Sequence, residues 1–317
     1  MHGGTVAEVA PVAAEPFAWP EPVGGLLGAG GFAAVWELGP DRVIKVAHAS
    51  HDLARARLHR EAEAMRAVQA ASGAQRAVPR VHDSGVLADG RAYIAMDRVT
   101  GTTVSDLLAE GTMRAPEAIA LALSALESLG KIHAAGFVHR DLKPDNLVRT
   151  PALNVVILDL GLARKLPADP DDPTRAGVQV GSLEYMPPEQ IADSASVDER
   201  SDLYAFGCVL YELLAGRPPF VGDAAALERA HAALRPPRLG ATVTIPAAID
   251  LLVGDLLAKD RARRPESVAA ARERLIVSRD ERTPPKMSHS VSMLREGKQP
   301  VVLLWAELPR VDRALLS

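Results

Sequence analysis

The spacing of hydrophobic residues changes along the chain and separates two regions of different predicted structure. From about residue 23 to about residue 98, short apolar and β-branched runs predict β-strands. These runs lie around Leu26–Leu27, Ala33–Leu38, Arg42–Ala47, Val86–Leu87 and Arg91–Met96. One segment among them, Asp52–Ala71, has polar and apolar residues at helical spacing instead. We therefore expect a small β-rich lobe that contains one helix.

Helical periodicity dominates the chain after about residue 103. Pro116 suits the first turn of a helix, and apolar residues recur at helical spacing through Ala118–Ala135. The almost wholly apolar segment Asp202–Ala215 predicts a buried helix. Further helices are predicted at Ala224–Leu234, Ala247–Leu257 and Ser267–Val277. A larger helical lobe thus follows the β-rich one, and the cleft between two such lobes is a natural ligand site.

The two ends of the chain differ in composition from this region. Residues 1–22 contain four prolines and three glutamates and lack the basic start and apolar stretch of a signal peptide, so we expect a flexible tail. Residues 279–300 are polar and interrupted by proline, which predicts a linker. Val301–Leu308 is apolar and strand-like. This last run is either an edge strand that docks on the body or the first element of a further domain.

Charge and cysteine content exclude several classes of protein. The chain carries 36 basic and 40 acidic residues, a net charge of -4, which gives no overall attraction to nucleic acid or anionic membranes. No stretch approaches the about 18 apolar residues that a membrane-spanning helix needs. Cys208 is the single cysteine, so an internal disulfide and a multi-cysteine metal site are ruled out. We therefore expect a cytoplasmic, reducing environment.

A glycine-rich segment, Gly28–Val35 (GAGGFAAV), lies between two predicted strands. Glycines let a hairpin backbone approach phosphate oxygens and point its amides at them. A plain turn is the alternative, because glycine-rich hairpins occur in many proteins. A Rossmann fingerprint is disfavoured, because Val35–Trp36 continues as a strand where that motif needs a helix. A Walker loop is excluded, because Gly-Lys-Ser/Thr is absent.

Lys45 stands on the otherwise apolar face that residues 43, 45 and 47 share in a predicted strand. Burying an ammonium costs free energy unless an anion lies beside it. The alternative is a lysine exposed at the surface of an edge strand. Glu61 on the following helix is the expected countercharge, and Glu63 is a weaker candidate. The chain has only 7 lysines, so a lysine is less often found inside a motif by chance.

The strongest chemical signal is His139–Asn146 (HRDLKPDN), in a loop between a predicted helix and the apolar run Asn154–Leu158. Asp159-Leu160-Gly161 follows this run, 18 residues after Asp141. One carboxylate can orient or receive a hydroxyl proton, and a neighbouring lysine can meet developing phosphate charge. Asn146 and Asp159 offer hard oxygen ligands suited to Mg²⁺. Each residue alone could be a turn or a cap, but together they predict in-line phosphoryl transfer.

On these motifs the chain resembles the eukaryotic-type protein kinases across residues 23–278, most closely their bacterial serine/threonine members. Further matches are the docking segment Gly181–Glu189, the loop-anchoring helix motif Ser201–Gly207 and Arg264, which resembles the arginine that pairs with Glu189. The resemblance implies an α+β, two-lobed kinase fold. Its small antiparallel β-rich N-lobe would span residues 23–98 and its larger helical C-lobe residues 99–278.

The resemblance also implies a role for each motif residue. Asp141 would be the catalytic base, Lys143 would steady the γ-phosphate of ATP, and Asn146 and Asp159 would hold Mg²⁺, for which Mn²⁺ is a substitute. Lys45 paired with Glu61 would bind the α- and β-phosphates, Met96 would gate the adenine pocket, and the backbone of Asp97 and Val99 would meet the adenine edge. The hairpin residues implied to cover the phosphates are Leu27, Gly28, Ala29, Gly30, Gly31, Phe32, Ala33 and Val35.

The implied activity is transfer of phosphate to serine or threonine hydroxyls of proteins, with self-association as a route to autophosphorylation. Four departures from the family pattern leave the required charges in place: Ala33 for the third glycine, Leu160 for the usual Phe, Pro187 for Ala, and Ser182 where Thr is commoner. Two alternatives stay open. One is a pseudokinase or ATP-binding scaffold, and the other is a small-molecule phosphotransferase, a class that lacks the docking segment.

Regulation through the segment between Asp159 and Glu189 is a further hypothesis from the resemblance. Arg140 resembles the arginine that receives a phosphate from this segment, and Thr174 is the expected acceptor. The acidic residues nearby, Asp169, Asp171 and Asp172, would partly mimic or repel that charge. A solvated, permanently mobile loop is the alternative.

Overall fold

The computed structural model describes residues 17–50, 52–73, 76–166, 182–193 and 196–280, together with the strand residues 293–294 and 301–302. The chain divides into two compact units, residues 1–281 and residues 282–317. The first 16 residues of the expected N-terminal tail lie outside the described part. No described helix combines the length and the apolar character that crossing a membrane requires.

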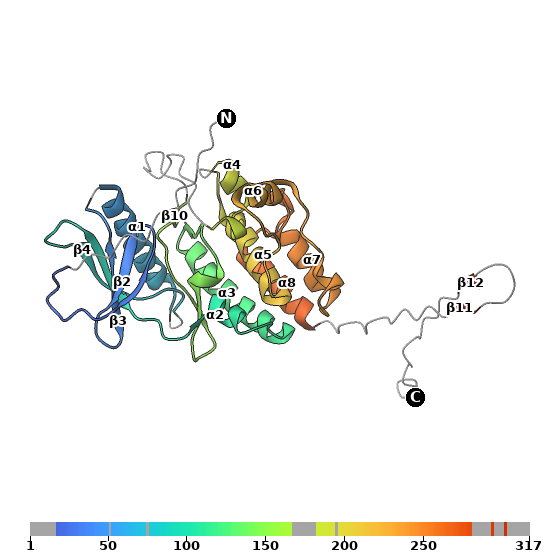
Figure 1. Ribbon diagram of the computed structural model, residues 1–317, viewed down its shortest axis with the longest axis horizontal. Helices are drawn as coiled ribbons and strands as arrows, with labels where there is room; N and C mark the ends of the chain where they lie inside the picture. Colours follow the sequence, from blue (N-terminus) through green and yellow to red (C-terminus); the bar gives the residue numbers. More distant parts are fainter. Residues whose placement is uncertain are drawn as a thin grey trace. The chain divides into compact units, whose positions relative to one another are not determined.

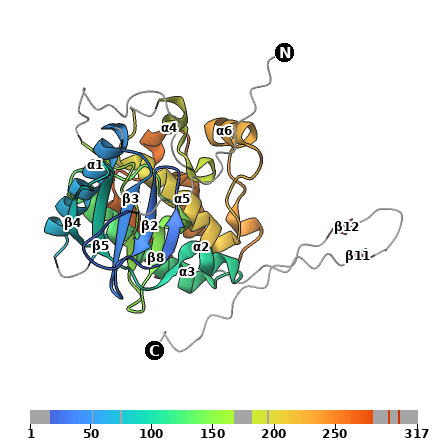
Figure 2. The ribbon, with the colours of Figure 1, turned by 60° about the vertical axis from the view of Figure 1, so that its left-hand side comes forward.

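The N-terminal part of the first unit is a five-stranded antiparallel sheet. Its strands run in the order β1 (Leu26–Ala29), β2 (Ala33–Glu37), β3 (Arg42–Ala47), β5 (Ala92–Asp97) and β4 (Val81–Val86). Figure 2 shows β2, β3, β5 and β4 side by side, with α1 (Asp52–Ala71) against them. The strand predicted around Val86–Leu87 is wrong in its bounds. The observed strand β4 is longer and more polar, and a register shift between Val81 and Asp83 interrupts its pairing.

Each face of the sheet buries a different apolar cluster. Val43, Ala47, Ile94 and Met96 join α1 in the main core, whereas Ile44, Val46 and Ala95 belong to a second cluster on the opposite face. This alternation is the period of two that a strand imposes. Aromatic side chains from three separate parts of the chain pack against the second cluster: Phe17, Trp19, Trp36 and Tyr93.

The N-terminal segment at residues 17–19 is therefore packed on the sheet. The Trp19 ring meets Tyr93 edge-on at 4.7 Å between centroids, and Phe17 meets Trp36 at 5.9 Å. This differs from the flexible tail expected through residue 22. The reason is that two aromatic side chains find apolar partners on β2 and β5, which a count of prolines and acids along the tail does not reveal.

The C-terminal part of the first unit is mainly helical, and Figure 1 shows α3, α5, α7 and α8 gathered at the end away from the sheet. The helices are α2 (Val104–Ala109), α3 (Ala115–Ala134), α4 (Pro188–Ala192), α5 (Glu199–Ala215), α6 (Ala224–Ala233), α7 (Ala247–Leu256) and α8 (Val268–Asp280). The predicted buried helix is confirmed: α5 is buried along nearly its whole length. It begins at a capping box between Asp198 and Ser201 and ends at Gly216, whose φ of 71° suits glycine.

Among the described residues, short strands form two further small sheets in the first unit and one in the second. One small sheet joins β6 (Thr102–Thr103), β8 (Leu147–Arg149) and β9 (Val155–Ile157), and a second pairs β7 (Phe137–Val138) with β10 (Arg164–Lys165). In the second unit, β11 (Met293–Leu294) pairs antiparallel with β12 (Val301–Val302). The described start of the strand-like run Val301–Leu308 thus has a strand partner within its own unit. The two-lobed α+β architecture is confirmed.

Candidate active site

A cavity of about 1000 Å³ lies between the sheet and the helical part of the first unit. All the residues implied for catalysis, nucleotide contact or metal binding line it: Leu27, Gly28, Ala29, Gly30, Gly31, Phe32, Ala33, Val35, Lys45, Glu61, Met96, Asp97, Val99, Asp141, Lys143, Asn146 and Asp159. These residues come from segments more than 130 positions apart. Motifs recognised separately in the sequence therefore face one shared cavity.

The glycine hairpin is built so that its backbone faces open space. A Cβ added to Gly28 or Gly31 would meet no atom within 4 Å, and one added to Gly30 would meet only the Ala33 carbonyl oxygen at 3.9 Å. None of the three has a positive φ, so the turn itself does not demand glycine. The hairpin is fixed by the Gly30 amide, which donates to the Ala33 carbonyl at 2.9 Å. The space that the missing side chains leave suits a ligand that approaches the backbone closely.

Lys45 meets two carboxylates at the back of the cavity. Its Nζ lies 2.7 Å and 2.9 Å from the two carboxylate oxygens of Glu61 and 3.0 Å from Asp159 Oδ1. Burial alone would lower the pKa of Lys45, but the attraction of Glu61 and Asp159 outweighs it and raises that pKa. The ammonium is thus held charged, as an anion-binding group must be.

Glu61 is the partner of Lys45, and Glu63 is not. The Glu61 side chain is 1% exposed, and burial raises its pKa to about 7 although Lys45 acts in the opposite direction. The Glu63 side chain is 59% exposed and lies 3.5 Å from His59 on the outer side of α1. Two residues of helix place these carboxylates on different faces.

The loop after β7 brings Asp141, Lys143 and Asn146 together. Lys143 Nζ lies 3.3 Å from Asp141 Oδ2 and donates to Ser182 Oγ at 2.9 Å. Asn146 Nδ2 donates to the Asp141 carbonyl at 2.8 Å. The backbone amide of Ser182 donates to Asp141 Oδ1 at 3.2 Å. A carboxylate and an ammonium therefore stand together at the wall of the cavity, beside the docking segment.

A buried carboxylate on α5 holds this loop in a strained conformation. Asp202 accepts the backbone amides of His139 at 2.7 Å and Arg140 at 2.8 Å, and His133 Nε2 lies 2.8 Å from it. Burial would raise the pKa of Asp202, but the hydrogen bonds around it, that from His133 first, hold it below its ordinary value. Arg140 has a φ of 70°, which a non-glycine residue keeps only when its surroundings fix it. The predicted anchoring role of the α5 motif is confirmed.

Asp159 also has a left-handed backbone, with a φ of 57°. Its Oδ1 accepts the Gly161 amide at 3.0 Å as well as Lys45. Burial acts to raise the pKa of Asp159, yet Lys45 and the Gly161 hydrogen bond hold it well below its ordinary value. The group is therefore a carboxylate at neutral pH.

The oxygens of Asn146 and Asp159 fit a hard divalent cation such as Mg²⁺. The Asn146 amide nitrogen is engaged with Asp141, so its oxygen is the atom offered to a ligand. Within the described residues no group of three or more His, Cys, Asp and Glu side chains is placed to hold a metal. A cation here would thus take two protein ligands and complete its shell with phosphate oxygens and water, as Mg²⁺ commonly does.

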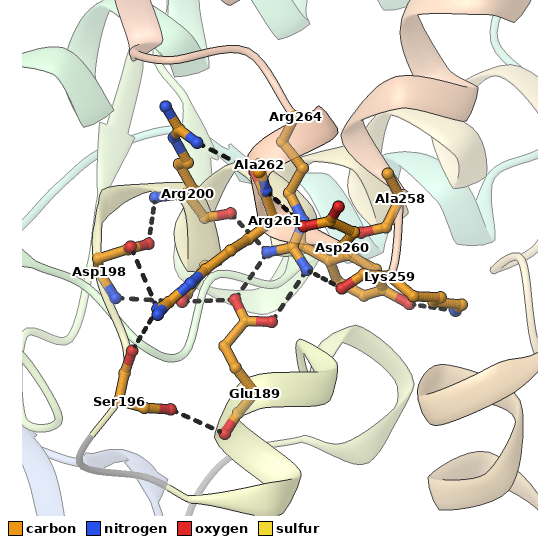
Figure 3. Close-up of polar contacts among 12 residues, drawn as sticks. Glu189, Ser196, Asp198, Arg200, Ala258, Lys259, Asp260, Arg261, Ala262 and Arg264 are labelled. Atoms are coloured by element: carbon orange, nitrogen blue, oxygen red, sulfur yellow. Dashed lines mark hydrogen bonds and ion pairs between the residues drawn. The ribbon is translucent and has the colours of Figure 1, made fainter.

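The docking segment is tied to the helical lobe by a buried ion pair (Figure 3). Arg264 donates to both carboxylate oxygens of Glu189, at 2.6 Å and 2.9 Å, and Ser201 Oγ donates to the same carboxylate at 2.6 Å. Burial would raise the pKa of Glu189, but Arg264 and Ser201 lower it. The pairing of Glu189 with Arg264 is confirmed.

Of the two expected regulatory residues, Arg140 is not part of the described cavity lining. Thr174 falls in residues 167–181, outside the described part of the chain. Arg140 lines a separate small crevice, and its carbonyl accepts Gln190 Nε2 at 3.0 Å.

Sequence reasoning missed several residues of the cavity. They are Val43, Arg57, Leu58, Met65, Pro79, Arg98, Asp145, Leu158, Leu162 and Ser182. The apolar members could have been found from strand and helix faces once Lys45 and Glu61 were placed. Arg57 had no such signal, because a helix arginine looks like any solvated one until its neighbours are known.

Comparisons with known proteins agree with this geometry. The sequence model described as "Protein kinase domain" matches residues 23–276. A probable serine/threonine-protein kinase of Streptomyces coelicolor is 39% identical over 215 residues, 63% of this chain and 31% of that protein. Serine/threonine-protein kinase PknB of Mycobacterium tuberculosis is 34% identical over 270 residues, 80% of this chain and 42% of that protein. Kinase pkn3 of Myxococcus xanthus is 34% identical over 269 residues, 79% of this chain and 48% of that protein. The chain therefore spans less than half the length of these relatives.

Proposed function

Because the chain belongs to the protein kinase family, we propose that residues 23–278 transfer the γ-phosphate of ATP to serine or threonine hydroxyls of proteins. The observation that carries this proposal is the shared cavity. It brings the ammonium of Lys45, the carboxylates of Asp159 and Asp141 and the ammonium of Lys143 around one volume. An inactive scaffold would be expected to lack Lys45, Asp141 or Asp159, and all three are present.

The nucleotide site would use groups already oriented in the structure. The backbone of the hairpin Gly28–Val35 would cover the phosphates, and Lys45, held by Glu61, would bind the α- and β-phosphates. Met96, Asp97 and Val99 would meet the adenine. These residues line the same cavity, and the raised pKa of Lys45 keeps it cationic.

Asn146 and Asp159 would hold Mg²⁺ beside the phosphates. The cation would supply positive charge that neutralises the phosphate oxygens. The depressed pKa of Asp159 supports this assignment, because the carboxylate stays ionised without the metal. Mn²⁺, with similar ligand preferences, would substitute.

The chemical step would depend on Asp141 and Lys143. Asp141 would orient the acceptor hydroxyl and receive its proton as the hydroxyl oxygen attacks the γ-phosphorus. The bond from the γ-phosphorus to the β–γ bridging oxygen would break, and ADP would leave. Lys143, 3.3 Å from Asp141, would stabilise charge on the transferred group. Asp202 accepts hydrogen bonds from the backbone amides of the loop, which would hold both residues in place before substrate arrives, so little reorganisation is needed.

A protein acceptor is favoured over a small molecule by the docking segment. Ser182 contacts both Asp141 and Lys143, so this segment stands at the reacting end of the cavity. The buried Glu189–Arg264 pair fixes the segment's far end. We place the activity in the cytoplasm, where ATP and a reducing environment coexist, and self-association would permit autophosphorylation.

Transfer of radiolabelled phosphate from ATP tests the proposal. Wild type and Asp141→Asn are each offered a generic basic protein and a panel of aminoglycosides. We expect wild type to label the protein and Asp141→Asn to lose at least about a hundredfold in rate, in line with the contribution of a positioned base. A retained ATP-dependent shift in the unfolding midpoint of Asp141→Asn controls for folding. Equal labelling by both proteins would refute the mechanism, and labelling of the aminoglycosides alone would refute the protein acceptor.

A further inference from the structure

Arg57 joins the glycine hairpin to α1 through a direct side-chain contact. It lies four residues before Glu61, so both side chains leave the same face of the helix. The Arg57 guanidinium carbon lies 3.7 Å from the centroid of the Phe32 ring, at the tip of the hairpin. A cation stacked on an aromatic face at this distance is an attractive contact. The hairpin tip and the helix that carries Glu61 are therefore linked.

The charge of Arg57 faces the phosphate-binding end of the cavity. Asp159, Glu61 and Asp141 are the carboxylates whose attraction acts on it, while burial is the largest influence and lowers its pKa. A Cβ added to Gly161 would lie 2.8 Å from Asp159 Oδ1, 3.2 Å from Glu61 Oε2 and 3.5 Å from Arg57 Nε. These distances place the Arg57 side chain beside the carboxylates that contact Lys45. Met96 lines the same cavity from strand β5.

The hydrogen-bond donors of Arg57 are uncommitted within the described part of the chain. Two other arginines of α1 donate hydrogen bonds to described residues: Arg55 Nε donates to the Gly90 carbonyl at 3.0 Å, and Arg66 Nη2 donates to Ser84 Oγ at 2.9 Å. Arg57 lines the cavity and has the Phe32 ring as its contact. A guanidinium offers five N–H groups, which suit a phosphate in bidentate geometry. A half-buried cation whose donors have no partner among the described residues is suited to bind an anion in the cavity.

We propose that Arg57 binds the terminal phosphate of the nucleotide, and that its stack on Phe32 holds the glycine hairpin down when this contact forms. The inference rests on the proposed function, since it names a further phosphate ligand of the same site. It predicts that Arg57 distinguishes a triphosphate from a diphosphate. Lys45, which would contact the α- and β-phosphates, would serve both nucleotides.

Calorimetric titration with ADP and with an ATP analogue bridged by an imido group tests this, in the presence of Mg²⁺. Arg57→Met should weaken the analogue about tenfold or more, as loss of a charge-assisted hydrogen bond would, and change ADP affinity by less than about twofold. Arg57→Lys, which keeps the charge, should recover part of the loss. Arg66→Met is the matched control on the same helix and should leave both affinities unchanged. Phe32→Leu should weaken the analogue, and its effect should be non-additive with Arg57→Met.

The outcomes separate the inference from the proposed function. If wild type binds both nucleotides but Arg57→Met weakens both equally, or weakens neither, the assignment of Arg57 to the terminal phosphate is overturned while the nucleotide site stands. Additive effects of Phe32→Leu and Arg57→Met would overturn the coupling. A wild type that binds neither nucleotide overturns the proposed function and this inference together.

Discussion

Replacement of Arg264 by methionine should destabilise the first unit more than loss of any surface charge. All five N–H groups of Arg264 are used: two bonds go to Glu189 and one each to the carbonyls of Ala258, Lys259 and Arg200. Its side chain is 0% exposed and that of Glu189 is 12% exposed. Methionine would therefore leave a largely buried carboxylate and three carbonyls without these donors. Breaking such a pair costs about 3–5 kcal/mol.

Denaturant titration followed by circular dichroism measures this change. For a unit of this size the same loss lowers Tm by roughly 10 °C. Arg263→Met is the matched control, because Arg263 is exposed and its replacement should cost under about 0.5 kcal/mol. Arg264→Lys should fall between, since an ammonium cannot reproduce the five-donor fork. If Arg264→Met lost less than about 1 kcal/mol, or no more than Arg263→Met, the Glu189–Arg264 pair would not be what holds the docking segment.

The pH dependence of this pair has a defined sign. Because Arg264 and Ser201 lower the pKa of Glu189 in the folded protein, its contribution to stability is present above the ordinary carboxyl pKa and is lost as pH falls through the folded value. Glu189→Gln should therefore lose most of its stability deficit relative to wild type in acid. A deficit that stayed constant from pH 7 to pH 3 would contradict the assignment.

Three further substitutions test other parts of the structure. Lys45→Met should leave the buried Glu61 carboxyl, whose pKa burial already raises to about 7, protonated in the folded variant. The variant's unfolding free energy should therefore fall as pH rises from the ordinary carboxyl pKa of 4.5 to the folded value, by at most about 1.4 kcal/mol per pH unit. A flat profile would argue against this, and Lys45→Met/Glu61→Gln is the control. Asp202→Asn should lower the transfer rate by at least about tenfold while nucleotide affinity changes little, because Asp202 holds the loop that carries Asp141; equal loss of both would contradict that role. Trp19→Ala should cost about 1–2 kcal/mol in urea, and an unchanged midpoint would show that the Trp19–Tyr93 contact does not form.

The residues with a proposed chemical role could be predicted from the sequence where they lie close together in one motif. Asp141, Lys143 and Asn146 sit within six residues of one another, so a single loop presents all three. Lys45 and Asp159 are 114 positions apart, and only the fold brings them to 3.0 Å. The resemblance implied a role for each residue in the nucleotide site, but it did not predict that the two side chains pair. The preference for Glu61 over Glu63 was made from the sequence, and the helix faces on which the two carboxylates lie confirm it.

Other parts were not predictable because their signal lies in distant partners. Strand β4 has the sequence VHDSGV, whose polar residues mask a strand that pairs along β5. The strands of two or three residues, such as β7 and β10, are too short to show a period. Phe17 and Trp19 pack because Trp36 and Tyr93 meet them from other strands. Arg57 became a candidate ligand only when Phe32 was found over it.

We propose that a nucleotide and a divalent cation bind together in the cavity that Lys45 and Asp159 line. The most direct measurement is the thermal unfolding midpoint of wild type and Asp159→Asn, titrated with ATP in the presence and absence of Mg²⁺. A ligand that binds only the folded state raises this midpoint, and the rise grows with the logarithm of ligand concentration above Kd. We expect a rise in wild type that grows when Mg²⁺ is added, and a rise in Asp159→Asn that Mg²⁺ does not increase. A wild-type midpoint unmoved by ATP under either condition, or an equal Mg²⁺ effect in both proteins, would contradict the account.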